Sequence, residues 1–217
     1  MPDDVQSRTT ANRRAVADLF AGLDDDQLDA PSLCAGWRCR DVLGHLVMTL
    51  DLSFPGFLRE VLRDRGRAGE TSDRLARSYA DQPVDRLVET LRRRSSTALA
   101  PPGVGLGGPF TDSCIHLRDV AIPLAITTTP PVSDWARVLD FLTTPRARRA
   151  GFLPRGRLDG LALVATDSPW TGGSGALVTG TSEALALSIT GRPVLLAHLE
   201  GDGATTLSDR VRAALPR

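Results

Sequence analysis

Two stretches of the chain carry side chains that bind metal ions. Asp112, His116 and Asp119 lie close together in the segment DSCIHLRD, and His45 lies much earlier, in VLGHL. On a helix, the three side chains of the later segment fall within an arc of roughly 60° on one face. An acid and an imidazole one turn apart, together with an imidazole from another helix, could bind one metal ion through three ligands and leave one coordination position open. Such a set suits Zn, Fe, Ni or Co better than Mg or Ca.

The spacing alone leaves a second interpretation open. His45 lies at the edge of the apolar face set by Val42, Leu46 and Leu50, so it could be a hydrogen-bonded histidine of the core. The acidic stripe around His116 could then be a solvated helix face. Asp119 is a candidate for orienting a ligand histidine or a neighbouring arginine from outside the coordination shell. A cap or a surface charge is the equally open alternative for Asp119.

These side chains have to be positioned by helices, because apolar residues recur at helical spacing through the first 130 residues. Four amphipathic helices predict an antiparallel bundle. The first contains Val16–Leu23 and is capped within Thr9–Asn12. The second runs from about Arg40 to Leu50, or to Leu62 with a break near Pro55. The third spans Val84–Leu99, and the fourth spans Pro109–Ile126.

The segment TTTPP at Thr127–Pro131 predicts a domain boundary, with the bundle at 1–130 and a second domain at 131–217. In the second domain we expect a helix over 134–142 capped by Ser133, strands over 161–166 and 176–179, and a helix over 181–189. The expected fold class is therefore mostly α with an α+β tail: a four-helix bundle followed by a small α+β domain.

Composition narrows the class of partners. The chain has 26 basic and 26 acidic residues and a formal net charge of zero, which argues against a nucleic-acid partner. No apolar run is long enough for a membrane span, and no targeting segment is visible, so we expect a cytoplasmic protein, as a monomer or a homodimer. The three cysteines are interpreted as small buried thiols, because their spacing completes no structural zinc site.

Several segments resemble one family. LCAGWRCRDVLGHL (33–46) is similar to the second-helix signature of the DinB-like, mycothiol-dependent maleylpyruvate isomerase family of actinobacteria. PFTDSCIHLRDVAIPL (109–124) resembles the fourth-helix signature of that family. VATDSPWTGGSGALVTG and ITGRPVLLAHLEGDGATTL resemble its second domain. These matches keep their order and cover most of the chain, so the resemblance implies a metal-binding bundle with a small α+β domain.

The resemblance also implies roles for residues. The metal ligands of the family fall on His45, Asp112 and His116, although glutamate is common where this chain has Asp112, which shortens the reach of the carboxylate. Arg192, in TGRP, matches the GR motif of the second domain and is the candidate catalytic residue, since a guanidinium can clamp a substrate carboxylate. The equally open alternative is that Arg192 closes a helix C-terminus.

The implied function is a metal- and mycothiol-dependent isomerase or thiol-S-transferase that acts on a small electrophile such as maleylpyruvate. Zinc is the first choice of metal, with nickel, iron and cobalt as alternatives, and the metal would activate a thiol or water. Mycothiol would supply the thiol cosubstrate: its thiolate adds to the cis double bond, and rotation and elimination give fumarylpyruvate. The alternative is a non-catalytic metal or small-molecule binding protein of the same fold, and a carrier of hydrophobic ligands ranks last.

Overall fold

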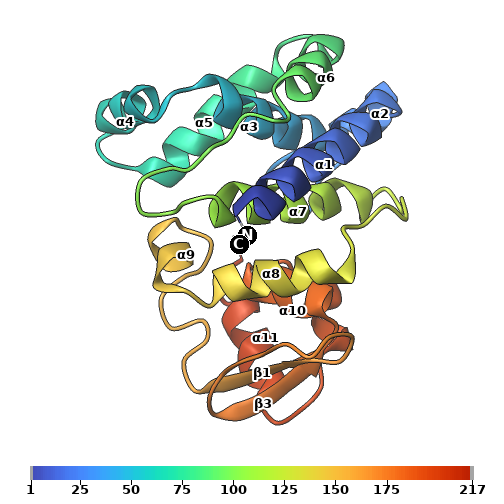
Figure 1. The fold of residues 1–217 in the computed structure, drawn as a ribbon, viewed down its shortest axis with the longest axis vertical. Helices are drawn as coiled ribbons and strands as arrows, with labels where there is room; N and C mark the ends of the chain where they lie inside the picture. Colours follow the sequence, from blue (N-terminus) through green and yellow to red (C-terminus); the bar gives the residue numbers. More distant parts are fainter. Residues whose placement is uncertain (1, 216–217) are drawn as a thin grey trace. The chain divides into compact units, whose positions relative to one another are not determined.

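A computed structural model describes residues 2–215, which form two compact units (Figure 1). The first unit comprises the residues up to Pro101 together with His116–Thr129. The second comprises Pro102–Ile115 together with the residues from Pro130 onward. The chain therefore passes from the first unit to the second beside residue 130, where the sequence predicts a domain boundary. It also passes from the second unit to the first within one continuous helix, after Ile115.

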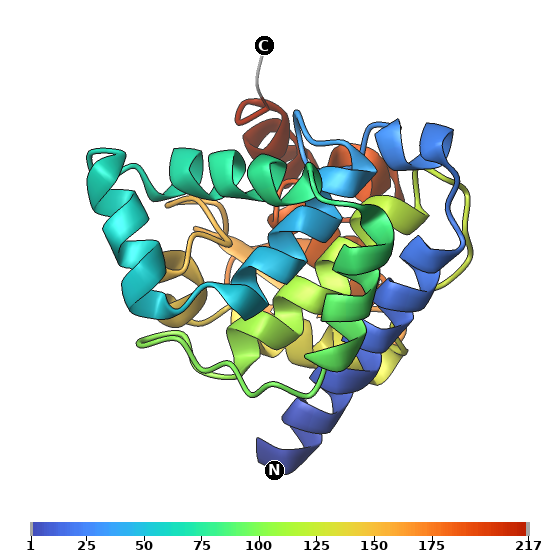
Figure 2. The same cartoon turned by 90° about the horizontal axis from the view of Figure 1, so that it is seen from above.

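A helical bundle forms the first unit. Its helices are α1 (Pro2–Ala21), α2 (Asp25–Asp29), α3 (Cys39–Asp51), α4 (Phe54–Arg63), α5 (Ala68–Ala80) and α6 (Val84–Arg93), with the C-terminal part of α7 (Gly107–Ala121). Seen from above, α1, α3, α6 and α7 run side by side (Figure 2). They share one apolar core, whose buried members include Phe20, Val42, Leu43, Leu87, Leu91, Leu117 and Val120. The predicted four-helix bundle is confirmed.

The predicted start of the first helix is wrong, whereas the break expected near Pro55 is confirmed. Helix α1 begins at Pro2, so the predicted cap lies inside the helix, where the hydroxyls of Thr9 and Thr10 donate to the carbonyls four residues earlier. The second predicted helix breaks in two after Asp51. Ser53 caps α4 by accepting a hydrogen bond from the backbone N–H of Gly56, and Pro55 lies in the first turn of that helix.

Helix α5 was not predicted, and it packs closely against α3. A Cβ atom placed on Gly44 of α3 would overlap the carbonyl oxygen of Ala76 and lie 2.7 Å from the backbone nitrogen of Ala80. Glycine at this position therefore lets the two helix backbones approach each other. The third predicted helix is also shorter than expected, because α6 ends at Arg93.

The second unit has a three-stranded sheet with helices on one face (Figure 1). Its elements are the first part of α7, α8 (Val132–Leu142), α9 (Pro145–Arg149), β1 (Leu161–Ala165), β2 (Thr171–Gly173), β3 (Ala176–Gly180), α10 (Ser182–Ile189), the 3-10 helix η1 (Pro193–His198) and α11 (Ala204–Arg212). The strand order is β2-β1-β3, with β1 antiparallel to β2 and parallel to β3. Helices α10 and α11 contact the sheet.

Most predicted elements of this unit are confirmed to within a residue or two. The exceptions are β2, α9, η1 and α11, which were not predicted, and the start of α8, where Pro131 rather than Ser133 occupies the cap position. The expected fold class, mostly α with an α+β tail, is confirmed.

The approach of α3 to α5 predicts the effect of two matched substitutions. Gly44→Ala should lower the free energy of unfolding by about 1–3 kcal/mol, because the added methyl group overlaps backbone atoms that cannot rotate away. Gly69→Ala in α5 meets nothing within 4 Å and should raise it by up to about 1 kcal/mol. Urea unfolding measures both as shifts of the midpoint at constant slope. Equal midpoints for the two variants would contradict the close packing of α3 and α5.

Candidate metal centre

The start of α3 is held by one buried carboxylate, and this places His45 one turn further along. Asp41, which is 2% exposed, accepts a hydrogen bond of 2.9 Å from the backbone N–H of Arg38. The guanidinium of Arg38 bonds both oxygens of Asp41 and also reaches Asp29. The side chain of Arg38 thus ties the helix N-terminus to α2.

The predicted ligands come together. Asp112 and His116 lie one turn apart on α7, so the helix itself sets their relative position. One potential ligand atom from each of His45, Asp112 and His116 lies within 4.8 Å of the other two. His116 is buried, whereas His45 and Asp112 are half-buried. The arrangement can hold one divalent ion with two imidazoles and one carboxylate.

Asp119 backs one of these histidines. Its Oδ2 lies 2.8 Å from Nδ1 of His116 and accepts a hydrogen bond of 3.0 Å from the thiol of Cys34. Asp119 is fully buried. Cys34, His116 and Asp119 form a second group with metal-binding atoms within 4.8 Å of one another. Hydrogen bonds to one shared carboxylate oxygen account for this second group without an ion.

An aromatic ring covers the two histidines. Trp37 stacks on His116, with ring centroids 6.2 Å apart and planes at 17°, and its centroid lies 5.3 Å from that of His45. The indole N–H donates to Asp73 on α5 over 3.0 Å. The Trp37 side chain is therefore fixed at both its ring face and its polar edge.

The loop that carries Trp37 and Cys34 is anchored at several points. The backbone N–H of Leu33 donates to the carbonyl of Asp119 over 2.9 Å. Gly36 has a φ of 77°, which favours glycine, and its carbonyl accepts a hydrogen bond of 2.9 Å from Arg77 on α5. These contacts join the loop to both α7 and α5.

Sequence reasoning missed part of this site. Cys34 was expected to be a buried thiol with no role here, yet it is half-buried and bonded to Asp119. Helix α5 was not predicted, yet it supplies Asp73 and also Ser72, whose hydroxyl lies 3.5 Å from Nδ1 of His45. The sequence did contain one indication of the loop's role, because Cys34 and Trp37 lie in the same family-like segment, 33–46, as His45.

Arg192 lies in the second unit, directly after α10. Its Nη1 donates to the carbonyl of Thr190 over 2.9 Å. This contact is of the kind expected for an arginine at a helix C-terminus. The catalytic assignment of Arg192 stays a prediction.

Comparisons with known proteins agree with the fold. Residues 9–103 match the family described as the mycothiol maleylpyruvate isomerase N-terminal domain. A solved structure of the mycothiol-dependent maleylpyruvate isomerase is similar, with a TM-score of 0.60, 12% identity and 94% of each chain covered. A histidine-to-alanine variant of that enzyme gives a TM-score of 0.59 at the same identity and coverage. No curated protein sequence matches the chain.

The class of protein is thus a DinB-like helical bundle joined to a small α+β unit. Residues 9–103 of its bundle match the model of the mycothiol maleylpyruvate isomerase N-terminal domain, so the resemblance found in the sequence is confirmed. Among residues 2–215, no helix combines the length and the hydropathy that a membrane span requires.

The three cysteines should differ in reactivity. Burial raises the pKa of the Cys39 thiol to about 11, so only about one molecule in 1,000 carries the reactive thiolate at pH 8. Cys114 is fully buried, and Cys34 is half-buried. We expect Ellman's reagent to modify one thiol rapidly in the folded protein and three after denaturation. Cys34→Ser should remove the rapid phase, and its persistence in that variant would contradict the burial of Cys39 and Cys114.

Proposed function

We propose that this protein is a metal- and mycothiol-dependent isomerase or thiol-S-transferase that acts on a small electrophile such as maleylpyruvate. The observation that carries the proposal is the convergence of His45, Asp112 and His116 within 4.8 Å. The family match over residues 9–103 supports mycothiol as the thiol. The family match does not favour the alternative of a non-catalytic binding protein.

The donor set fits a divalent ion. Two imidazoles and one carboxylate are ligands that zinc takes in catalytic sites, and nickel, iron and cobalt accept them as well. Nδ1 of His116 faces Asp119, so Nε2 is the nitrogen that would bind the ion. Asp112 would supply a carboxylate one methylene shorter than glutamate. We propose that this set holds one zinc ion.

Asp119 would act as a positioning residue for this set. A carboxylate that accepts from Nδ1 fixes the orientation and the tautomer of His116 and makes Nε2 a better ligand. Because Asp119 is buried, water does not compete for its hydrogen bond to His116. Loss of such an outer partner typically costs about 10–100-fold in metal affinity.

The remaining groups would shape the reaction space. A divalent ion bound by the three ligands would lower the pKa of a thiol or water at its open position. The indole of Trp37 covers both histidines and would limit the access of bulk water. The thiol of Cys34 is bonded to Asp119, which leaves mycothiol to supply the nucleophilic sulfur. Arg192 would bind a carboxylate of the substrate. We also propose that the protein works in the cytoplasm, as a monomer or a homodimer.

A set of histidine variants tests the proposal. His116→Ala should lose stoichiometric zinc and thiol-dependent isomerisation, because His45 and Asp112 alone would leave the ion with only two protein ligands. His198→Ala is the matched control, since His198 is exposed on η1 in the second unit, and it should keep both. Asp119→Asn should keep the metal with affinity about 10–100-fold lower. Elemental analysis, zinc titration and turnover of maleylpyruvate with mycothiol provide the measurements.

Two outcomes would count against the proposal in different ways. One equivalent of zinc in purified His116→Ala would refute the ligand assignment. Zinc at one equivalent in the unaltered protein, without turnover of maleylpyruvate or of other electrophiles in the presence of mycothiol, would refute the enzymatic function and leave the metal centre in place.

A further inference from the structure

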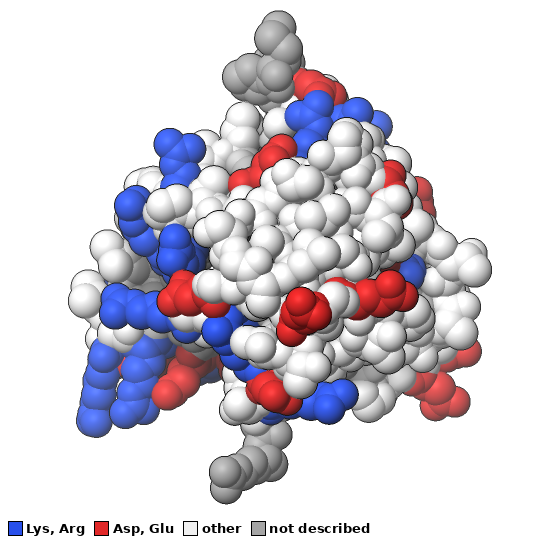
Figure 3. Space-filling model, turned by 90° about the horizontal axis from the view of Figure 1, so that it is seen from below, with Lys and Arg blue, Asp and Glu red and all other residues white. Residues whose placement is uncertain are grey.

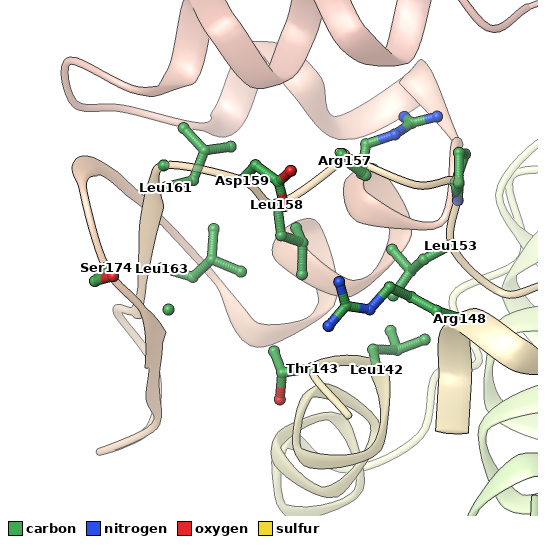
Figure 4. Close-up of a pocket in the computed structure, with 14 residues that line it drawn as sticks. Leu142, Thr143, Arg148, Leu153, Arg157, Leu158, Asp159, Leu161, Leu163 and Ser174 are labelled. Atoms are coloured by element: carbon green, nitrogen blue, oxygen red, sulfur yellow. The ribbon is translucent and has the colours of Figure 1, made fainter. Parts of the chain in front are cut away.

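We propose that the second unit contains a binding site for a small monocarboxylate with an apolar body. The site is a cavity of about 300 Å³ between the end of α8, α9, the 153–160 segment and strands β1 and β2 (Figure 4). All the residues that line it belong to the second unit. The proposal does not depend on the metal centre or on the proposed reaction.

The wall of the cavity is largely aliphatic. Five leucines line it, from three separate parts of the unit: Leu142, Leu153, Leu158, Leu161 and Leu163. Four of them, all but Leu158, are less than 5% exposed, so their side chains are held in place by the core. An apolar wall fixed in this way can receive a hydrocarbon group without rearrangement.

A positive charge projects into this apolar space. Figure 4 shows the guanidinium of Arg148 directed among the side chains of Leu158, Leu142 and Thr143. Figure 3 shows arginine side chains gathered at the left edge of the face seen from below. The last turn of α9 carries three arginines, and Arg148 alone of these lines the cavity.

A second positive charge lies at the edge of the cavity. Arg157 is 5% exposed, and its Nη1 has no hydrogen-bond partner among the described residues. Burial and the neighbouring Arg210 lower the pKa of its guanidinium. Figure 4 shows that its head group points away from that of Arg148, so Arg157 would contribute charge rather than a second hydrogen-bonded clamp.

These two charges have no acidic partner within the described part of the chain. Among residues 2–215, no acidic side chain forms an ion pair with Arg148 or Arg157. Arg210 donates to the carbonyls of Arg157 and Asp159 over 3.2 and 2.8 Å, which holds the 157–159 segment in place. Arg157 is the buried one of the two, and because a buried charge without a partner destabilises the fold, an anion in the cavity would offset part of that cost.

The chemistry of the lining selects the ligand. The volume lies at the lower end of the range of about 300–1,000 Å³ found for small-molecule sites, which suits a short acid. A guanidinium binds a carboxylate through two parallel hydrogen bonds. Asp159, the one acid that lines the cavity, is exposed, and its charge disfavours a ligand with the two negative charges of a phosphate.

Calorimetric titration of the full chain with hexanoate and with its neutral analogue hexanamide tests the proposal. Hexanoate should bind about 10-fold more tightly than hexanamide, because only the carboxylate gains charge-assisted hydrogen bonds. Arg148→Gln should reduce the affinity for hexanoate by about 10-fold and leave hexanamide unchanged. Arg149→Gln is the matched control, because Arg149 is an exposed neighbour on α9 outside the cavity, and it should bind as the unaltered chain does.

Four results would overturn the proposal: no heat of binding with hexanoate, equal affinity for acid and amide, equal losses in the two arginine variants, or tighter binding of inorganic phosphate than of hexanoate. Circular dichroism and the thermal midpoint verify that both variants remain folded. Arg148 is exposed over much of its side chain, so its substitution should not disturb the core.

Discussion

The interaction on which the candidate centre depends is the contact of a buried carboxylate with an imidazole. The carboxylate of Asp119 lies 2.8 Å from Nδ1 of His116 and accepts a hydrogen bond from the thiol of Cys34. Its backbone carbonyl accepts a hydrogen bond from the N–H of Leu33. One residue of α7 thereby fixes the ring of a proposed ligand and the loop beside it. Because Trp37 lies in the same loop, the cover over the histidines is positioned through the same residue. If Asp119 did not hold its place, both the ligand and the cover would lose their orientation.

A second constraint is the close approach of α3 and α5, which Gly44 permits. Helix α5 brings Ser72 to His45 and Asp73 to Trp37, so its distance from α3 sets how firmly both rings are held. The geometry of the centre thus depends on the two helices that carry the proposed ligands, on one helix that carries none and on one loop. The side chains that carry the chemistry are few, but their positions depend on much of the bundle.

The sequence predicted what periodicity and spacing can reveal. The stripe on α7 and the apolar faces of α3 and α6 follow from residues three and four apart, and the strands β1 and β3 from short apolar runs. Helix α5 could not be found in this way, because its buried positions are Thr71, Ala76 and Ala80 rather than large apolar residues. Strand β2 has only the residues Thr-Gly-Gly, which show no alternation. The contact of Cys34 with Asp119 joins residues 85 apart and depends on tertiary structure alone.

X-ray absorption at the zinc edge tests the central claim most directly, because it identifies the atoms bound to the ion. The full chain loaded with one equivalent of zinc should show only nitrogen and oxygen neighbours at about 2.0–2.2 Å, with the multiple scattering of two imidazoles. That result would match His45, Asp112 and His116 as the ligands. A sulfur neighbour at about 2.3 Å would contradict the account, because it would place the ion with Cys34, His116 and Asp119 instead.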